Sequence, residues 1–300
     1  MEIVRELREI PNLSLALGFF DGVHMGHQAV IGCAVEFARA VGCKSAIVTF
    51  KEHPYCYFKG ESPKYILTLE DKYKYLEEMG LDYVIELDFG IVCHMSPTQY
   101  LEQILVKYFS PKAISTGFNH NFGVNKSGNV LFLSDCQDKY NYVYFATPPQ
   151  SVFGDIVSST AIRSFIKGGI VDMANSMLGR KFSVEGTVIH GRHVAAEVLG
   201  YPTANIIYPL DVIELPHGVY DVEVELEDGS TYRGLANYGT SPTLTNDGIT
   251  ILETYLLNYE GSLYGKQMRV YFNKMLRPEY KFNSVDELRI QIGLDVQSLY

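Results

Sequence analysis

The hydrophobic pattern of the first half of the chain predicts strands that alternate with helices. Apolar runs typical of short buried strands occupy 13–17, 45–50, 83–87, 113–116 and 142–146. Amphipathic or capped segments between them predict helices at 30–41, 68–79 and 97–109. The first of these helices is expected to end at Gly42, because glycine commonly follows a helix. Repeated strand–helix units predict a parallel sheet with helices on both faces and a ligand crevice at the carboxyl ends of the strands.

After about residue 180 the pattern changes to short alternating runs separated by glycine and proline. These runs occupy 184–189, 219–226, 231–236, 252–259 and 267–272. Asp228-Gly229 is typical of a hairpin turn, and Ser284 opens a capping box before a last helix. We therefore expect a small antiparallel β-barrel with a terminal helix. The predicted domains are 1–172 and 181–300, joined by a helical linker at 173–180.

Composition narrows the class of protein. The chain has 300 residues, 47% of them hydrophobic and 20% charged, as in ordinary globular proteins. Its net charge of −10 argues against nucleic acid and anionic membranes as general partners. The sequence shows neither a signal-peptide layout nor an apolar run of membrane-spanning length, and its five cysteines form no C-x-x-C pair. We expect a cytoplasmic protein with reduced thiols, and we leave its oligomeric state open.

A glycine- and histidine-containing turn follows the first buried strand. The segment 18–27 reads Gly-Phe-Phe-Asp-Gly-Val-His-Met-Gly-His and leads directly into a predicted helix. Helix N-termini bind phosphate, because their unpaired N–H groups and the helix dipole favour anions. His24 and His27 are therefore candidate ligands of a polyphosphate, together with the turn residues Gly18, Phe19, Asp21 and Gly22. The alternative is a glycine turn with two incidental surface histidines.

A second candidate anion site lies at Ser158-Ser159-Thr160. These residues precede a predicted helix that carries Arg163, so hydroxyl groups, backbone N–H groups and a guanidinium are available together. The alternative is an ordinary serine-capped helix with a solvated arginine.

The 18–27 segment resembles the signature of the nucleotidylyltransferase superfamily and, more narrowly, the adenylyltransferase half of bacterial bifunctional riboflavin kinase/FAD synthetases. The serine motif is similar to the Ser-Ser-Thr-x-x-Arg element of that family. The resemblance implies a Rossmann-like nucleotidylyltransferase domain in which His24, His27 and Arg163 are catalytic. It also implies flavin-side residues in two loops, namely His53, Pro54, Asn119 and Phe122. The second loop departs from the family pattern, because His120 replaces an aromatic residue and Asn121 replaces an arginine. A plain polar loop is the alternative there.

The second half resembles riboflavin kinases. Gly200-Tyr201-Pro202-Thr203-Ala204-Asn205 matches a kinase element, and other matches follow in order between 179 and 295. The resemblance implies Thr203 and Asn205 at a metal, Glu253 as the catalytic base, and nucleotide or flavin contacts from Gly191, Gly200, Pro202, Asn237 and Arg277. The alternatives are a solvent-exposed Glu253 and a surface Arg277. A further departure is Val194-Ala195-Ala196-Glu197, where the family has a glycine and a basic residue.

These resemblances imply a bifunctional transferase. Its C-terminal domain would phosphorylate riboflavin to FMN with ATP, and its N-terminal domain would adenylylate FMN to FAD and release pyrophosphate. Mg²⁺ is expected with ATP, because nucleotide chemistry usually requires it. One alternative is a flavin-binding sensor or regulator of the same fold that has lost an activity. Another is a nucleotidylyltransferase that acts on a different phosphorylated acceptor.

Overall fold

The computed structural model of the chain describes residues 1–190, 200–240 and 250–300. The chain forms two compact units, Met1–Ser159 and Thr160–Tyr300, and each is described by itself. The domain boundaries expected from the sequence, at 172 and 181, stay a prediction. Within the described ranges, no helix combines the length and the apolar character needed to cross a lipid bilayer.

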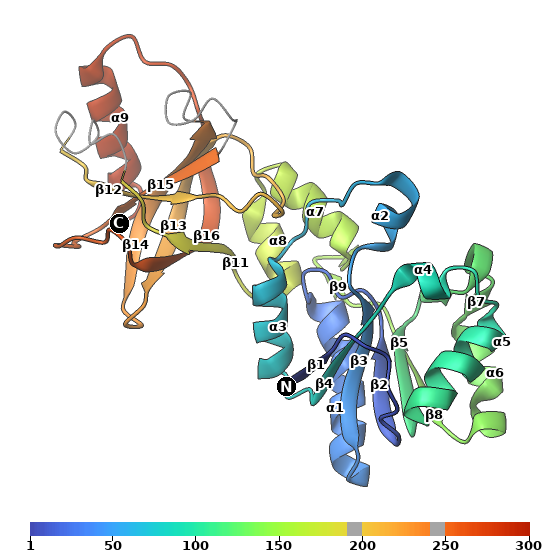
Figure 1. Ribbon diagram of the computed structural model, residues 1–300. Helices are drawn as coiled ribbons and strands as arrows, with labels where there is room; N and C mark the ends of the chain where they lie inside the picture. The colour runs from blue at the N-terminus through green and yellow to red at the C-terminus, as the bar shows by residue number, and fades with distance from the viewer. Residues whose placement is uncertain (191–199, 241–249) are drawn as a thin grey trace. The chain divides into compact units, whose positions relative to one another are not determined.

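The first unit is built on a six-stranded sheet with the order β1-β4-β3-β2-β5-β8, in which every neighbouring pair is parallel (Figure 1). Its strands are β1 (Glu2–Val4), β2 (Leu13–Leu17), β3 (Lys44–Phe50), β4 (Tyr83–Leu87), β5 (Ala113–Gly117) and β8 (Val143–Thr147). From β2 the chain proceeds to β3 on one side and later returns to β5 on the other. The carboxyl ends of β2 and β5 therefore form a topological switch point, where ligands bind in open α/β sheets.

Helices cover both faces of this sheet, as the sequence predicts. The helices of the unit are α1 (Met25–Val41), α2 (Pro54–Lys59), α3 (Leu69–Glu78), α4 (Phe89–Val92), α5 (Pro97–Tyr100), the π-helical η1 (Leu101–Phe109), the 3-10 turn η2 (Val124–Lys126) and α6 (Val130–Tyr140). Leu13, Leu15 and Leu17 of β2 pack with η1 and α6 on one face, and Ala16 packs with α1 on the other. This alternation follows from the two-residue period of a strand.

Short hairpin strands lie in the loops of the first unit. They are β6 (Asn121–Phe122) with β7 (Gly128–Asn129), and β9 (Ser151–Val152) with β10 (Asp155–Ile156). The first hairpin follows β5 and the second follows β8, so both lie beyond the carboxyl ends of their strands.

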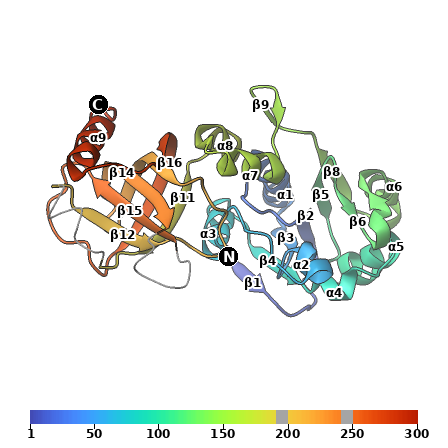
Figure 2. The same ribbon diagram turned by 90° about the horizontal axis from the view of Figure 1, so that it is seen from above.

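The second unit holds helices and a curled antiparallel sheet with the order β11-β16-β13-β14-β15-β12 (Figure 2). Its elements are α7 (Ser159–Lys167), α8 (Val171–Leu178), β11 (Phe182–Thr187), β12 (Thr203–Ile207), β13 (Gly218–Leu226), β14 (Thr231–Thr240), β15 (Thr250–Leu256), β16 (Gln267–Pro278) and α9 (Val285–Gln297). The edges of the sheet approach each other where the Ile189 N–H donates to the Asn205 carbonyl at 2.8 Å. This is the small antiparallel barrel expected from the sequence, with its terminal helix.

Candidate active sites

The turn between β2 and α1 brings the two signature histidines together. His24 is the N-cap of α1, and its Nδ1 accepts the backbone N–H of His27 at 3.2 Å. Because Nδ1 accepts this bond, the proton of the neutral His24 ring stands on Nε2. The two imidazoles stack with their centroids 3.5 Å apart and their planes 17° apart.

Close packing explains the glycines of this turn. A Cβ on Gly26 would lie 3.1 Å from Cε1 of His24, and a Cβ on Gly22 (φ 82°) would lie 2.9 Å from Cδ1 of Ile66. Phe20 (φ 59°) and Val23 (φ 38°) also adopt the left-handed backbone conformation. This conformation costs non-glycine residues free energy, and it is concentrated at functional sites.

Buried polar contacts stabilise the turn between β2 and α1. One carboxylate oxygen of Asp21 accepts the Ile66 N–H at 3.0 Å, and the Phe19 carbonyl accepts from Nζ of Lys72 at 2.6 Å. Burial lowers the pKa of Lys72 to about 8, although the nearby carboxylates Asp21 and Glu86 oppose this shift. Asp21 thus supports the turn. Its predicted contact with the nucleotide stays a prediction.

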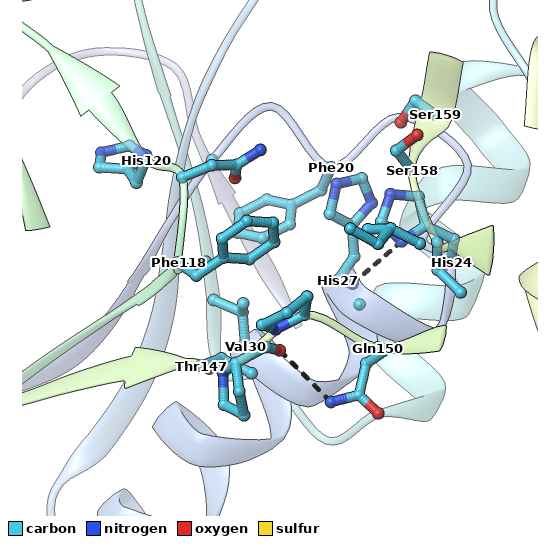
Figure 3. A pocket seen from close by; sticks show the side chains of 18 of the residues that line it. Phe20, His24, His27, Val30, Phe118, His120, Thr147, Gln150, Ser158 and Ser159 are labelled. Carbon is cyan, nitrogen blue, oxygen red and sulfur yellow. Dashed lines mark hydrogen bonds between the residues drawn. The ribbon is translucent and has the colours of Figure 1, made fainter. Parts of the chain in front are cut away.

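A cavity of about 280 Å³ opens beside the two histidines, at the ends of β2, β5 and β8 (Figure 3). The residues that line it include Gly18, Phe20, His24, Gly26, His27, Phe118, Asn119, His120, Thr147, Gln150, Ser158 and Ser159. In Figure 3 the imidazoles lie near Ser158 and Ser159, and Phe118 and Thr147 lie on the other side. This cavity occupies the switch point of the sheet, where a nucleotide site is expected.

The serine motif is divided between the two units. Ser158 and Ser159 line the cavity, and Oγ of Ser159 donates to the Asp21 carbonyl at 3.0 Å. Thr160 and Arg163 belong to α7 and to the second unit. The contact of Arg163 with the nucleotide therefore stays a prediction.

A second cavity of about 480 Å³ lies at the ends of β2 and β3 and shares Leu17, Gly18 and His120 with the first. Its lining is mostly apolar and aromatic, with Phe19, Val48, Phe50, Pro54, Phe58, Phe89, Val92 and Phe122 among its members. Such a surface suits a flat ring system. Of the four flavin-side residues expected from the sequence, Pro54 and Phe122 line this cavity and Asn119 lines the smaller one. His53 caps α2 and packs edge-on against Phe19, with centroids 4.7 Å apart.

Nε2 of His120 and Oγ1 of Thr147 are buried beside these cavities, and neither atom has a hydrogen-bond partner among the described residues. Burial lowers the pKa of His120 to about 4, so its ring is neutral at physiological pH. Sequence reasoning noted His120 only as a departure from the family pattern and missed Thr147, since nothing in its local sequence distinguishes it from other strand threonines.

In the second unit, strand register places the predicted kinase residues in one row. Glu253 on β15 pairs with Asn205 on β12 and with Asn237 on β14. Val219 on β13 then pairs with Asn237 and with Arg277 on β16. Directly paired residues point to the same face of a sheet, so the four polar residues share one face across five strands.

A cavity of about 300 Å³ lies over this row and under α9. The residues that line it include Tyr201, Thr203, Asn237, Glu253, Tyr255, Arg277, Glu279, Tyr280, Phe282 and Asp295. Burial, and then the nearby carboxylate of Glu279, raise the pKa of Glu253 above its ordinary value. A raised pKa suits a carboxylate that accepts a proton during catalysis. The aromatic lining of this cavity could not be predicted from the sequence, because strand register and the packing of α9 bring these side chains together. The aromatic residues are Tyr201, Tyr255, Tyr280 and Phe282.

Arg277 is anchored on α9 by a buried ion pair. Its guanidinium donates to both carboxylate oxygens of Asp295, with the shortest distance 2.8 Å, and it lies over the Tyr280 ring at 4.8 Å. Only 15% of the Arg277 side chain and 8% of the Asp295 side chain are exposed. Arg277 is therefore no surface residue, and it holds the helix that covers the cavity.

A smaller cavity of about 160 Å³ adjoins the row at Thr203. Pro202, Leu263 and Tyr264 also line it, and the Tyr264 ring stacks on His190 at 4.0 Å. Asn205 is 4% exposed, and its Oδ1 has no hydrogen-bond partner within the ranges that the structure describes. Gly200 (φ 78°) forms the turn before these residues. Gly191 and the segment 194–197 lie outside the described residues.

Comparison with known families agrees with this division of the chain. A family model described as FAD synthetase matches residues 7–161, and one described as riboflavin kinase matches residues 178–299. The first match contains the two histidines and both cavities of the first unit. The second contains the row of polar residues on the curled sheet.

Similar proteins match the chain over nearly its whole length. A bifunctional riboflavin kinase/FMN adenylyltransferase of Haemophilus influenzae is 32% identical over 99% of this chain and 98% of its own. One of Listeria monocytogenes is 33% identical, over 95% and 91% of the two chains. A solved structure described as a macrolide-efflux protein from Streptococcus pneumoniae is 27% identical, with a TM-score of 0.86 over 98% of this chain and 97% of that one. The macrolide-efflux description applies to the Streptococcus pneumoniae protein only. By both family models and by these full-length relatives, the chain belongs to the family of bifunctional riboflavin kinase/FMN adenylyltransferases.

Proposed function

We propose that the second unit phosphorylates riboflavin to FMN with ATP, and that the first unit adenylylates FMN to FAD and releases pyrophosphate. The observation that carries this proposal is the pair of stacked histidines at the N-terminus of α1, facing a cavity at the switch point of a parallel sheet. Membership of the family supports both activities.

In the first unit, ATP would occupy the cavity beside the histidines, and FMN would occupy the larger apolar cavity. A phosphate oxygen of FMN attacks the α-phosphorus of ATP, and the bond from that phosphorus to the bridging oxygen breaks. Pyrophosphate leaves with the electron pair. The attacking phosphate is already an anion at neutral pH, so this step needs no strong base. The protein has to position the two phosphates in line and stabilise the developing negative charge.

His24 and His27 suit this task. The proton on Nε2 of His24 makes that edge of the ring a hydrogen-bond donor, and the N–H groups of the first turn of α1 add donors and a favourable dipole. The hydroxyl groups of Ser158 and Ser159 lie on the same side of the cavity (Figure 3). In this proposal, Arg163 adds positive charge at the departing pyrophosphate.

In the second unit, riboflavin would occupy the cavity under α9, and ATP would occupy the adjoining cavity lined by Pro202 and Thr203. The terminal ribityl hydroxyl attacks the γ-phosphorus, its proton passes to Glu253, and ADP leaves. The raised pKa of Glu253 fits a base that accepts this proton. Thr203 lines both cavities, so it marks the place where the two substrates meet.

The residues present fit a magnesium ion held mainly by nucleotide phosphates. Within the described ranges, no group of three His, Cys, Asp or Glu side chains is arranged to hold a metal. The Asn205 amide oxygen is nonetheless buried without a partner among the described residues, beside the hydroxyl-bearing Thr203. Mg²⁺ typically takes few protein ligands and completes its shell with phosphate oxygens and water. When bound, the ion would neutralise charge on the transferred phosphoryl group.

A product assay tests the proposal. Purified wild-type protein is incubated with riboflavin and Mg-ATP, and flavins and pyrophosphate are quantified over time. FMN should appear first, followed by FAD with one pyrophosphate per FAD. Tight flavin binding without turnover would instead identify a sensor, and FMN formation without FAD would remove the role proposed for the histidine turn.

A further inference from the structure

We propose that His120 is a specificity-determining residue of the adenylyl-transfer site, whose imidazole Nε2 donates a hydrogen bond to the phosphate arm of the flavin substrate. This inference rests on the proposed function of the first unit. It concerns a residue of this chain at which the sequence departs from the family pattern.

His120 stands where the two cavities of the first unit meet. The residues that line both cavities are Leu17, Gly18 and His120. Adenylyl transfer joins a flavin in one cavity to a nucleotide in the other, so the attacking phosphate has to stand at this junction. His120 is the polar side chain among these three shared residues.

The polar lining of the larger cavity points to the same part of the substrate. Apart from Tyr100 and Cys93, its polar side chains come from one loop, namely His120, Asn121, Asn125 and Lys126. The rest of the lining is apolar and suits the flavin ring. The ribityl phosphate arm therefore runs along this loop, toward His120 and the smaller cavity.

The His120 ring offers a hydrogen-bond donor that makes no hydrogen bond to the described residues of the free protein. Its Nε2 is buried without a hydrogen-bond partner among the described residues, and such a group costs free energy until a ligand pairs with it. The ring stacks on Phe122, with centroids 5.7 Å and planes 23° apart, so its orientation is supported. A neutral ring donates one hydrogen bond without adding a charge.

Two substitutions separate the hydrogen bond from the stacking. His120→Phe keeps an aromatic ring against Phe122 and removes the donor, whereas His120→Gln keeps a donor and removes the ring. We expect His120→Phe to raise the KM for FMN in FAD formation by roughly tenfold, as for the loss of one hydrogen bond to a charged acceptor. The KM for ATP should stay within about twofold, and His120→Gln should recover part of the loss. Riboflavin phosphorylation by the same samples is the internal control.

A measurement on the wild-type protein keeps the inference testable if a variant fails to fold. With uniformly ¹³C- and ¹⁵N-labelled protein, the His120 side-chain resonance is assigned through its backbone signals, and either folded variant confirms the assignment by losing it. FMN should move its titration to higher pH, because a phosphate dianion favours the imidazolium, and riboflavin should not. An unchanged KM for FMN in His120→Phe, or equal shifts with FMN and riboflavin, would overturn the inference. Wild-type protein that forms no FAD would instead contradict the proposed function.

Discussion

Gly26 leaves room for the His24 ring and for no side chain of its own, since a Cβ there would lie 3.1 Å from Cε1 and 3.2 Å from Nδ1 of His24. The Gly26→Ala variant tests what this space is for. Alanine favours helix by up to about 1 kcal/mol over glycine, so folding should be little affected. The displaced imidazole should lower the rate of FAD formation by about ten- to a hundredfold, because small misplacements at a reacting centre are costly.

Gly32→Ala on the same helix is the matched control for that variant. A Cβ at Gly32 would meet nothing within 4 Å. The Gly32→Ala variant should form FAD at the wild-type rate and have a slightly higher melting temperature. Equal rates of FAD formation in the two variants would show that the fit of Gly26 against His24 has no role in catalysis.

Thr147→Val tests whether the buried hydroxyl of Thr147 contacts the nucleotide in the cavity beside His24 and His27. Thr147 is 6% exposed and its Oγ1 has no partner among the described residues, so a nucleotide bound in this cavity is its expected partner. Valine keeps the shape and removes the hydroxyl. The KM for ATP in FAD formation should rise about fivefold, the size of one net hydrogen bond.

Ser14→Ala controls for the loss of a buried hydroxyl as such. Oγ of Ser14 is likewise buried without a partner in the described part of the chain, but Ser14 is not among the residues that line the cavity. The Ser14→Ala variant should have the same KM for ATP as the wild type. A Thr147→Val enzyme with an unchanged KM for ATP would remove Thr147 from the nucleotide site.

The pH dependence of FMN formation follows from Glu253. Burial and the charge of Glu279 raise the pKa of Glu253 above its ordinary value of 4.5. As the pH is lowered, FMN formation should therefore begin to fall while the pH is still above 4.5. Glu279→Gln removes the repulsion between two carboxylates, and the ionised form of Glu253 becomes easier to reach. The acid limb of the pH–kcat profile should therefore move to lower pH, although burial keeps part of the shift. An acid limb that stays in place, or moves to higher pH, would contradict this role of Glu279.

Asp295→Ala tests the ion pair that anchors α9. Removing one partner of a buried pair leaves an uncompensated charge and typically costs about 3–5 kcal/mol. The amides of α9 should lose protection in hydrogen exchange, and FMN formation should fall with them. Asp286→Ala, at an exposed position in the first turn of the same helix, should cost less than about 1 kcal/mol. Equal exchange in the two variants would show that Arg277 does not hold the helix.

Local chemistry explains why much of the fold could be predicted from sequence. Thr68 caps α3 by accepting the Asp71 N–H, and Ser96 forms a capping box with Gln99. Gly42 ends α1 with a φ of 72°. Each of these signals lies within a few residues of the helix end that it defines, so no knowledge of tertiary structure is needed.

The elements that the sequence analysis missed depend on distant partners. Strand β1 has three residues, and its pairing with β4 brings together segments about 80 residues apart. Strand β12 was noted only as a kinase motif, although its pairing with β15 is what places Asn205 beside Glu253. Motif spacing does not encode strand register, so the row of polar residues could be named from the sequence but not assembled.

The candidate sites show the same limit. His24 and His27 were identified because the turn that holds them is continuous in sequence. The Lys72 contact that supports this turn crosses 53 residues, and Thr147 reaches the cavity only because β8 lies beside β5. Supporting contacts of this kind follow from the packed sheet.

Parallel measurement of FMN and FAD formation by His24→Ala and Glu253→Gln tests the central claim most directly. His24→Ala should form FMN from riboflavin at the wild-type rate and lose FAD formation by roughly a hundredfold or more, as when a preorganised donor is removed from a transition state. Glu253→Gln should lose FMN formation and still convert supplied FMN to FAD. Formation of FAD by His24→Ala at the wild-type rate would contradict the claim that the histidine turn holds the reacting phosphates.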